Sequence, residues 1–368
     1  MKHLVALAMS FTLLFALFAP ATISAQADAA SAADAALVWM RDQQQADGSF
    51  LGFGPGDSAD AVFALVAAGE DPAAVQQDGN SALDYLSTQA SGYATSVGAA
   101  AKLVMAAVAG NQDPTSFGGV DLLAVIGKGY DPTTGQYGPD VFGHALALLA
   151  LKSVGVEAPA AAVDRLLALQ LPDGGWSFDG TADTGSDTNT TALAIQALAD
   201  NSAAQDVVDT ALAYLKTQQN DDGGFPYSQT SSFGSDSDAN STAYVLQALA
   251  AAGADAADSD WTAPNGDPLS TLVGLQNDSG AMRYQATAPD DNALATYQAV
   301  AGLLSRPLPV ATTTVVGAEA LLIPAASLPA TGTSGSHEWL LAMALILLIG
   351  GLAVVRGHSA QRTAHKSK

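Results

Sequence analysis

Two kinds of apolar segment alternate along the middle of the chain. The first kind places Leu, Val and aromatic residues at three- and four-residue spacing, which is typical of an amphipathic helix with one buried face. Segments of this kind are residues 32–45, 81–89, 160–170, 206–219 and 268–276. The second kind is rich in Ala and Leu and has few charges after its first turn, which predicts a helix buried on most sides. Segments of this kind are residues 57–69, 95–110, 139–155, 189–200, 240–253 and 291–304.

A glycine-containing turn stands between the two kinds of segment. The turns end in an aromatic residue, or in Met at the last one, and their end points are Phe50, Tyr93, Tyr137, Trp176, Phe225 and Met282. Several amphipathic segments end in Gln just before an Asp-Gly pair, where a helix is expected to stop. The repetition predicts an all-α fold, an α6/α6 toroid of six helical hairpins over residues 28–305 with the apolar helices inside. An open solenoid is the alternative arrangement.

One repeat carries a family resemblance. The run LLALQLPDGGWSF at residues 166–178 resembles the QW repeat of squalene cyclases, and the whole arrangement is similar to the prenyltransferase/squalene-oxidase repeat superfamily with its terpenoid-cyclase toroid. The run DDNALATYQAVAGLLSRPLP at 290–309 resembles the end of the α domain in intrinsic-factor/transcobalamin-like proteins, which implies cobalamin as a candidate ligand. The small β domain of that family has no counterpart here. Such a resemblance indicates a fold and does not choose an activity.

The resemblance to terpene cyclases implies a specific acid. Class II cyclases protonate an alkene with the middle Asp of D-x-D-D-T-A at the start of an inner helix, and that chemistry needs a neutral carboxylic acid beside other carboxylates. The matching positions are Asp187, Asn189 and Thr190 in one repeat, Asp238, Asn240 and Ser241 in the next, and Asp290, Asp291 and Asn292 in the last. Two of these stretches keep only the first acid, and the third lacks the Thr-Ala that follows. Cyclase chemistry is therefore disfavoured.

The other catalytic constellations of the superfamily are also incomplete. The zinc site of protein prenyltransferases and the thioester of complement domains both need Cys, and the chain has none. Inside residues 28–305 the only His is His144, which we expect to face the core or the cavity rim rather than to act in catalysis.

Composition adds a strongly acidic balance. The net charge is −23, with 32 Asp against 4 Glu, which excludes nucleic acid as an expected partner because phosphate binding needs a basic face. Many of the Asp residues precede inner helices, where N-capping is the simplest role and Asn189, Asn240 and Asp291 are expected caps. If the ring closes, the same residues form an acidic rim over a cavity, which makes the nine positions above candidate ligand-binding residues. Asp236, Asp238 and Asn240 also resemble the start of a calcium loop, without its Gly and Glu.

Both ends of the chain indicate export. Residues 1–27 are typical of a signal peptide, with a basic start, an apolar stretch and an Ala-Gln-Ala exit. Residues 328–368 resemble a cell-wall sorting signal, with LPATG, an apolar run at 339–355 long enough to span a membrane, and a basic tail. That resemblance implies recognition of Leu328, Pro329, Thr331 and Gly332 by sortase, cleavage after Thr331 and linkage to cell-wall peptidoglycan. A single-span membrane anchor is the alternative, and residues 306–327 are expected to be a spacer.

Three functional hypotheses follow. The leading one is an exported toroid, anchored to the wall or the membrane, that binds a small molecule or an envelope component at the acidic mouth without catalysis. Cobalamin and Ca²⁺ are its candidate cofactors. The second is a divergent terpene-cyclase or prenyltransferase-like enzyme, which leaves enzymatic activity open. The third is a structural display or adhesion protein.

Overall fold

The computed structural model describes residues 21–232 and 234–318, and these form twelve α-helices with three short β-hairpins. The first part of the expected signal peptide, the sorting motif and the expected membrane-spanning run at 339–355 lie outside the described residues. Within the described ranges, no helix has both the length and the apolar character needed to cross a membrane.

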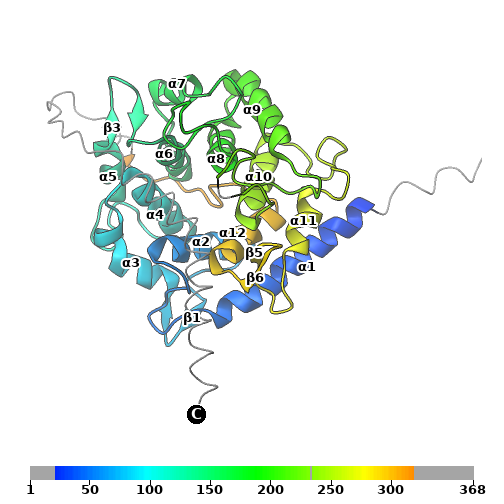
Figure 1. The fold of residues 1–368 in the computed structure, drawn as a ribbon. Helices are drawn as coiled ribbons and strands as arrows, with labels where there is room; N and C mark the ends of the chain where they lie inside the picture. The colour runs from blue at the N-terminus through cyan, green and yellow to red at the C-terminus, as the bar shows by residue number, and fades with distance from the viewer. Residues whose placement is uncertain (1–20, 233, 319–368) are drawn as a thin grey trace, which may run out of the picture.

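Six helices form a closed inner ring. They are α2 (Pro55–Ala67), α4 (Val97–Ala109), α6 (Val141–Ser153), α8 (Thr188–Leu198), α10 (Ala239–Ala252) and α12 (Ala293–Leu303). Each packs against the next in this order, and α12 packs against α2, which closes the ring. They lie toward the middle of the molecule in Figure 1. Most of their residues are buried, in agreement with their apolar sequences. The closed arrangement is consistent with the predicted toroid and excludes the open solenoid.

Six further helices lie outside the ring. They are α1 (Ala21–Asp42), α3 (Ala82–Tyr93), α5 (Leu122–Lys128), α7 (Ala160–Ala168), α9 (Gln205–Gln218) and α11 (Pro268–Gly274). The first of them, α1, packs on α11 and α12 and so covers the junction between the last repeat and the first. It begins before the expected start of the domain, so the expected signal-peptide exit after Ala27 lies inside this helix. The short helix α5 was not among the predicted segments.

The glycine turns connect each repeat to the next. In the fourth repeat Gly174 has a φ of 91°, and a Cβ there would lie 2.7 Å from the carbonyl oxygen of Thr210 in the following outer helix. Gln170 donates from its Nε2 to the carbonyl oxygens of Gly174 and Val207, at 2.9 Å each. The Gln of the repeat therefore fixes both its own turn and the next repeat.

The joint that closes the ring uses the same contacts. A Cβ on Gly280, whose φ is 92°, would lie 2.5 Å from the carbonyl oxygen of Ala35 in α1. Gln276 donates to the carbonyl oxygens of Gly280 and Ala32, at 2.8 and 2.7 Å. The contacts between the last repeat and α1 are the same as those between consecutive repeats. The repeat motif itself therefore closes the ring.

One predicted turn is wrong. The Ser-Gly-Tyr that ends at Tyr93 lies inside α3, and Tyr93 is the last residue of that helix. Gly92 does not have positive φ, and no Asp-Gly pair stops the helix before it. The hairpins sit in connections instead: β1 (Gln76–Gln77) with β2 (Asn80–Ser81), β3 (Tyr130–Asp131) with β4 (Gln136–Tyr137), and β5 (Arg283–Gln285) with β6 (Ala288–Asp291).

Residues 305–318, here called the strap, run across the end of the ring where the inner helices finish. The Leu308 N–H donates to Oε1 of Gln196 at 2.8 Å, and Leu308 is buried. The Thr313 N–H donates to the carbonyl oxygen of Ser153 at 2.8 Å. The first half of the segment expected to be a spacer therefore packs on the ring, since its apolar residues find a surface there that composition alone does not reveal.

Candidate functional site

The starts of α8 and α10 are capped by the first acid of their motifs. Oδ1 of Asp187 accepts the Thr190 N–H at 2.7 Å, and Oδ1 of Asp238 accepts the Ser241 N–H at 2.7 Å. Asn189 and Asn240 were expected as caps, and that expectation is wrong because the Asp two residues earlier occupies the capping position. The two Asn side chains, at the second helical position, are left free for other contacts.

A polar network crosses the middle of the ring. Asn240 on α10 donates from Nδ2 to Oε1 of Gln298 on α12 at 2.7 Å. Gln298 donates to Oδ2 of Asp60 on α2 at 3.2 Å, and the Lys102 ammonium on α4 donates to the same oxygen at 2.8 Å. Four of the six inner helices are therefore joined by hydrogen bonds near their N-terminal ends. We call Asp60, Lys102, Asn240 and Gln298 the axial network.

The ion pair of the axial network is mostly buried, with the Lys102 and Asp60 side chains 19% and 7% exposed. Burial works to lower the pKa of Lys102, but the Asp60 carboxylate, with the Tyr93 and Tyr244 hydroxyls, outweighs it and the pKa ends above its usual value. Burial raises the pKa of the neighbouring Asp57, partly offset by the Phe53 N–H. Lys102 therefore stays charged, and the Asp60 carboxylate neutralises its charge in an ion pair.

Aromatic side chains gather at the end of the ring where the inner helices begin, which we call the mouth. The ring of Phe142 stacks on Phe178 at a centroid distance of 6.0 Å and meets Tyr244 edge-on at 6.5 Å. Phe142 lies on α6 and Tyr244 on α10, and α8 stands between these helices in the ring. The aromatic rings of Phe142 and Tyr244 thus meet next to the N-terminal end of α8, where Asn189 is the second residue. All three aromatic side chains remain partly exposed.

Polar atoms at the start of α8 lack partners. Oδ1 of Asn189 and Oγ1 of Thr188 are buried and accept no hydrogen bond from the described residues. The equivalent Asn240 is engaged by Gln298, so the two repeats differ at this point. A buried oxygen without a donor is costly, and a bound molecule that supplies a hydroxyl or amine would satisfy it.

The two capping acids hold protons more readily than free Asp. Burial raises the pKa of Asp187 to about 6, against hydrogen bonds from Thr190 that lower it. Burial raises the pKa of Asp238 to about 7, against the opposing bonds from Ser241. Thr190 and Ser241 are themselves buried next to the capping Asp residues, so their side chains are not exposed to a ligand at the mouth.

The last candidate stretch lies elsewhere. Asp290 and Asp291 are exposed on β6, and Oδ1 of Asp291 accepts from Nδ2 of Asn277 at 2.8 Å and Oγ of Ser279 at 2.9 Å. Asn292 caps α12 through the Ala295 N–H. These residues hold a hairpin and a helix start, and they bring no carboxyl group to the axial network. The expectation that Asp291 caps α12 is wrong because the next residue, Asn292, occupies the capping position.

The calcium candidates do not converge. Asp236 is exposed, Asp238 points into its own helix start and Asn240 into the axial network. Within residues 21–232 and 234–318 no cluster of three or more His, Asp or Glu side chains is placed to hold a metal ion.

The single His of the domain is structural. His144 is fully buried, its Nδ1 accepts the Tyr137 N–H at 3.0 Å, and its Nε2 lies 2.9 Å from the carbonyl oxygen of Ala162. Burial lowers its pKa to about 4, so the ring is neutral at physiological pH. In other repeats the same position is held by Thr191, Thr242 and Thr296, each accepting the N–H that follows the glycine turn.

The sequence interpretation placed Asn240 among the candidates and missed Lys102 and Gln298 of the axial network. Asp60, Lys102, Tyr244 and Gln298 each lie four residues after the second position of their inner helix, so they share its face. The available signal was an isolated polar residue at a fixed place in an apolar helix. Its direction, toward the axis rather than toward an outer helix, depends on how the ring closes.

Solved structures share this architecture, whereas no family model and no curated protein sequence matches the chain. A type II terpene cyclase, MstE from Scytonema, is similar with a TM-score of 0.56 and 15% identity over 77% of this chain and 98% of that one. The same cyclase in complex with geranylgeranyl dihydroxybenzoate has a TM-score of 0.56 and 14% identity over the same shares. A protein from Actinoplanes has a TM-score of 0.55 and 17% identity, covering 75% of this chain and 98% of that chain. The fold is thus that of the terpenoid-cyclase toroid.

Proposed function

We propose that this protein binds a small molecule or an envelope component at the mouth of the ring, without acid catalysis. The observation that carries the proposal is the axial network. Where a class II cyclase would need a free carboxylic acid on the axis, this chain has Asn240 bonded to Gln298 and an Asp60 engaged by Lys102. An ion pair and two amides on the floor of the mouth favour a polar ligand over a hydrocarbon chain.

The surroundings narrow the ligand chemistry. Phe142, Phe178 and Tyr244 offer flat apolar surfaces, and Asn189 offers an amide with no partner among the described residues. A molecule with an apolar face and several hydroxyl or amine donors fits both features. Sugars of an envelope polymer have this chemistry, which agrees with the expected export and anchoring of the chain.

Titration with soluble disaccharide-peptide fragments of peptidoglycan tests the proposal. We expect saturable binding at one site, weakened at least tenfold by Asn189→Ala and by Phe142→Ala. Asn265→Ala, on an exposed outer loop, is the matched control and should bind like the wild type. Absence of saturable binding, or equal binding by Asn189→Ala and Asn265→Ala, would overturn the choice of ligand. Cobalamin and Ca²⁺ are titrated in parallel as the other candidates.

A second candidate function is cyclisation of a prenyl compound, favoured by Asp238, whose pKa of about 7 leaves it partly protonated at neutral pH. Against it, both oxygens of Asp238 accept from Ser241, so the acid is occupied in capping α10. Incubation with squalene and geranylgeranyl dihydroxybenzoate, followed by product analysis, separates the two. A cyclised product that disappears in Asp238→Asn would replace the binding proposal.

Export and anchoring are part of the same proposal. The signal-peptide and LPATG patterns support them, and the expected partners are sortase and cell-wall peptidoglycan. In the native host, Thr331→Ala should leave the protein associated with the membrane instead of covalently linked to the wall. Unchanged wall linkage of this variant would contradict the sortase assignment and favour a simple membrane anchor.

A further inference from the structure

A cavity lies at the other end of the ring from the mouth. It has a volume of about 440 Å³ and is lined by Val66, Ala67, Ala68, Gly69, Leu304, Arg306 and Val310. The first four residues are the end of α2 and the two residues that follow it, and the last three are Leu304, which follows α12, and two residues of the strap. The mouth lies at the start of α2, so about 15–20 Å of helix separates the two places.

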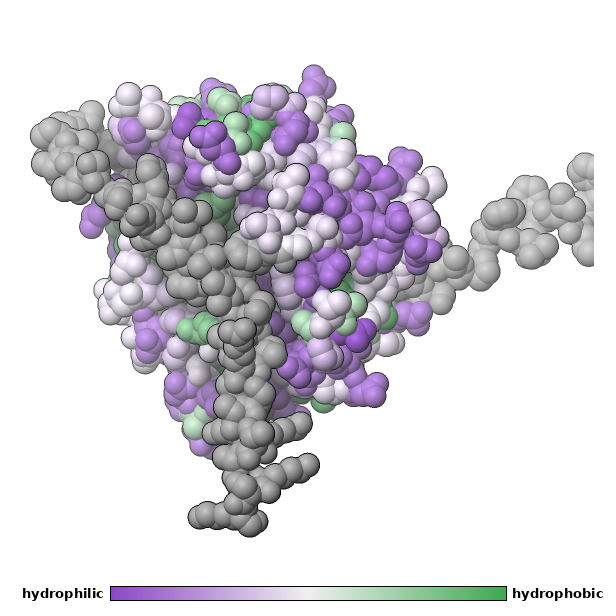
Figure 2. All heavy atoms as spheres, in the orientation of Figure 1, coloured by the Kyte–Doolittle hydropathy of each residue, from purple (hydrophilic) through white to green (hydrophobic). Residues whose placement is uncertain are grey.

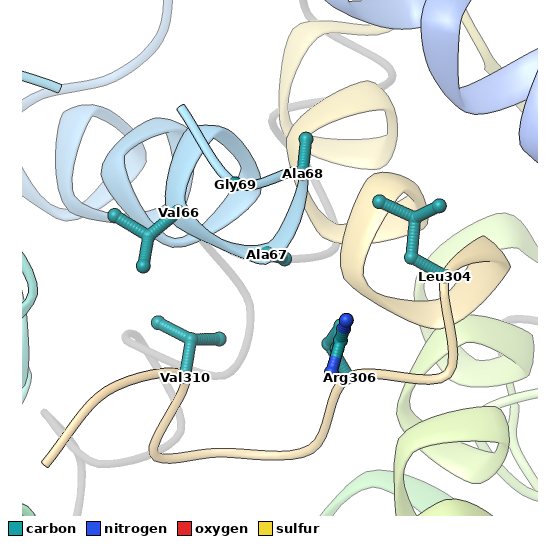
Figure 3. Close-up of a pocket in the computed structure, with 7 residues that line it drawn as sticks. All are labelled: Val66, Ala67, Ala68, Gly69, Leu304, Arg306 and Val310. Atoms are coloured by element: carbon teal, nitrogen blue, oxygen red, sulfur yellow. The ribbon is translucent and has the colours of Figure 1, made fainter. Parts of the chain in front are cut away.

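Small residues create the space. Ala67 ends α2, Ala68 caps it and Gly69 follows with a φ of 80°, so this corner of the ring carries little side-chain volume. On the opposite wall the strap contributes Val310, and Figure 3 shows Val66 and Val310 facing each other with Ala67 opposite Arg306. A volume of this size is within the range of small-molecule pockets.

Three backbone N–H groups of the wall are already hydrogen-bonded within the protein. The N–H groups of Ala68, Gly69 and Arg306 donate to carbonyl oxygens of Ala64, Val66 and Ala301, respectively. The Arg306 guanidinium has no hydrogen bond or ion pair with the described residues. The other side chains that line the cavity are apolar, those of Val66, Ala67, Ala68, Leu304 and Val310.

Arg306 places an unpaired cation beside this cavity in an acidic protein with a net charge of −23. Three other basic side chains of the described residues form ion pairs: Arg41 with Glu70, Lys102 with Asp60 and Lys152 with Asp200. An unpaired guanidinium beside an apolar cavity presents donors in a fork that matches a carboxylate.

We propose that the cavity between α2 and the strap is a second binding site, for a small amphiphile with an apolar body and one carboxylate. The apolar part lies between Val66, Val310 and Leu304, and the carboxylate pairs with Arg306. This site does not depend on the function proposed for the mouth, since the two share no residue.

The test uses decanoate, below its micelle concentration, with decanol as the neutral analogue of the same length. Calorimetric titration of the intact protein should show one saturable decanoate site and at least tenfold weaker decanol binding. Arg306→Gln should reduce decanoate affinity at least tenfold, and Ala68→Leu, which fills the cavity, should abolish binding of both. Lys128→Gln removes an exposed cation from α5 and is the matched control that should leave binding unchanged.

Two results would overturn the proposal. Equal affinity of decanoate for wild type and Arg306→Gln would show that the guanidinium does not select a carboxylate. Binding of several decanoate molecules per protein, unaffected by Ala68→Leu, would show adsorption to the surface instead of a site. Circular dichroism establishes that each variant is folded, and Arg306→Gln decides the question if Ala68→Leu is not.

Discussion

The two ends of the ring are built on the same six helices but present different side chains. At the N-terminal ends the inner helices bring charged and amide side chains to the axis, where Asp60, Lys102, Gln298 and Asn240 bond to one another. At the C-terminal ends the strap packs on the ring, and α2 finishes in small residues that leave a cavity beside the strap. The repeat fixes the ring, and a few residues at equivalent positions decide what each end can bind.

The coloured part of the face seen in Figure 2 has no large hydrophobic patch. Figure 2 shows hydrophilic residues over most of the visible face, with hydrophobic ones in small separate groups. The distinction lies in partly buried positions, which makes it testable by single substitutions at each end.

The largest expected effect is at the axial network. Lys102→Met leaves the buried Asp60 carboxylate without its cation, which should lower the free energy of unfolding by about 3–5 kcal/mol. Urea denaturation measures it, and Lys128→Met is the control at an exposed site. A loss below about 1 kcal/mol would show that solvent screens the pair and that the mouth is wetter than its contacts indicate.

At the opposite end, Leu308→Ala should cost about 2–3 kcal/mol, because it removes a buried side chain that holds the strap to the ring. Gln196→Leu keeps most of the buried volume but removes the acceptor for the Leu308 N–H and the Nε2 donor to the Ala192 carbonyl oxygen, and it should cost about 1 kcal/mol. Denaturation with both variants checks the order. A negligible effect of Leu308→Ala would mean that the strap is not part of the folded domain.

The capping acids predict a pH dependence. The pKa of Asp238 is raised by burial from 3.8 to about 7, so its contribution to stability is complete below pH 3.8 and is lost as the pH rises to about 7. Asn can cap the helix without ionising. The wild type should therefore lose stability relative to Asp238→Asn by up to about 1.4 kcal/mol per pH unit across this window. A constant difference between the two proteins at all pH values would contradict the raised pKa.

The smallest effect is expected at Arg306. Its side chain is exposed and unpaired, so Arg306→Gln should change the free energy of unfolding by less than about 0.5 kcal/mol. The same substitution is expected to weaken decanoate binding at least tenfold. A large loss of stability would instead assign Arg306 a structural role at the strap.

The helices were predictable because their apolar spacing is regular over many residues. The segments expected for α2, α4, α6, α8, α10 and α12 agree with the structure to within a few residues. The seven residues of α5 are too few to show a period, and the end of α3 was mistaken for a turn because Gly92-Tyr93 resembles the others.

The site was predictable only in part. The stretches around Asp187 and Asp238 do lie at the mouth, but which Asn is free and which is bonded follows from Gln298, which comes from another repeat. The partners in the axial network come from four different helices, so no local pattern connects them. The strap was misjudged because Pro and Thr are typical of spacers whether or not a groove receives them.

Hydrogen exchange with and without saturating peptidoglycan fragments tests the central claim most directly, since it reports both ends of the ring at once. The account predicts increased protection of peptides covering the starts of α8 and α10, residues 187–193 and 238–245, and no change in the strap at 305–318. Protection confined to the strap, or no change at either end, would contradict the assignment of the mouth as the binding site.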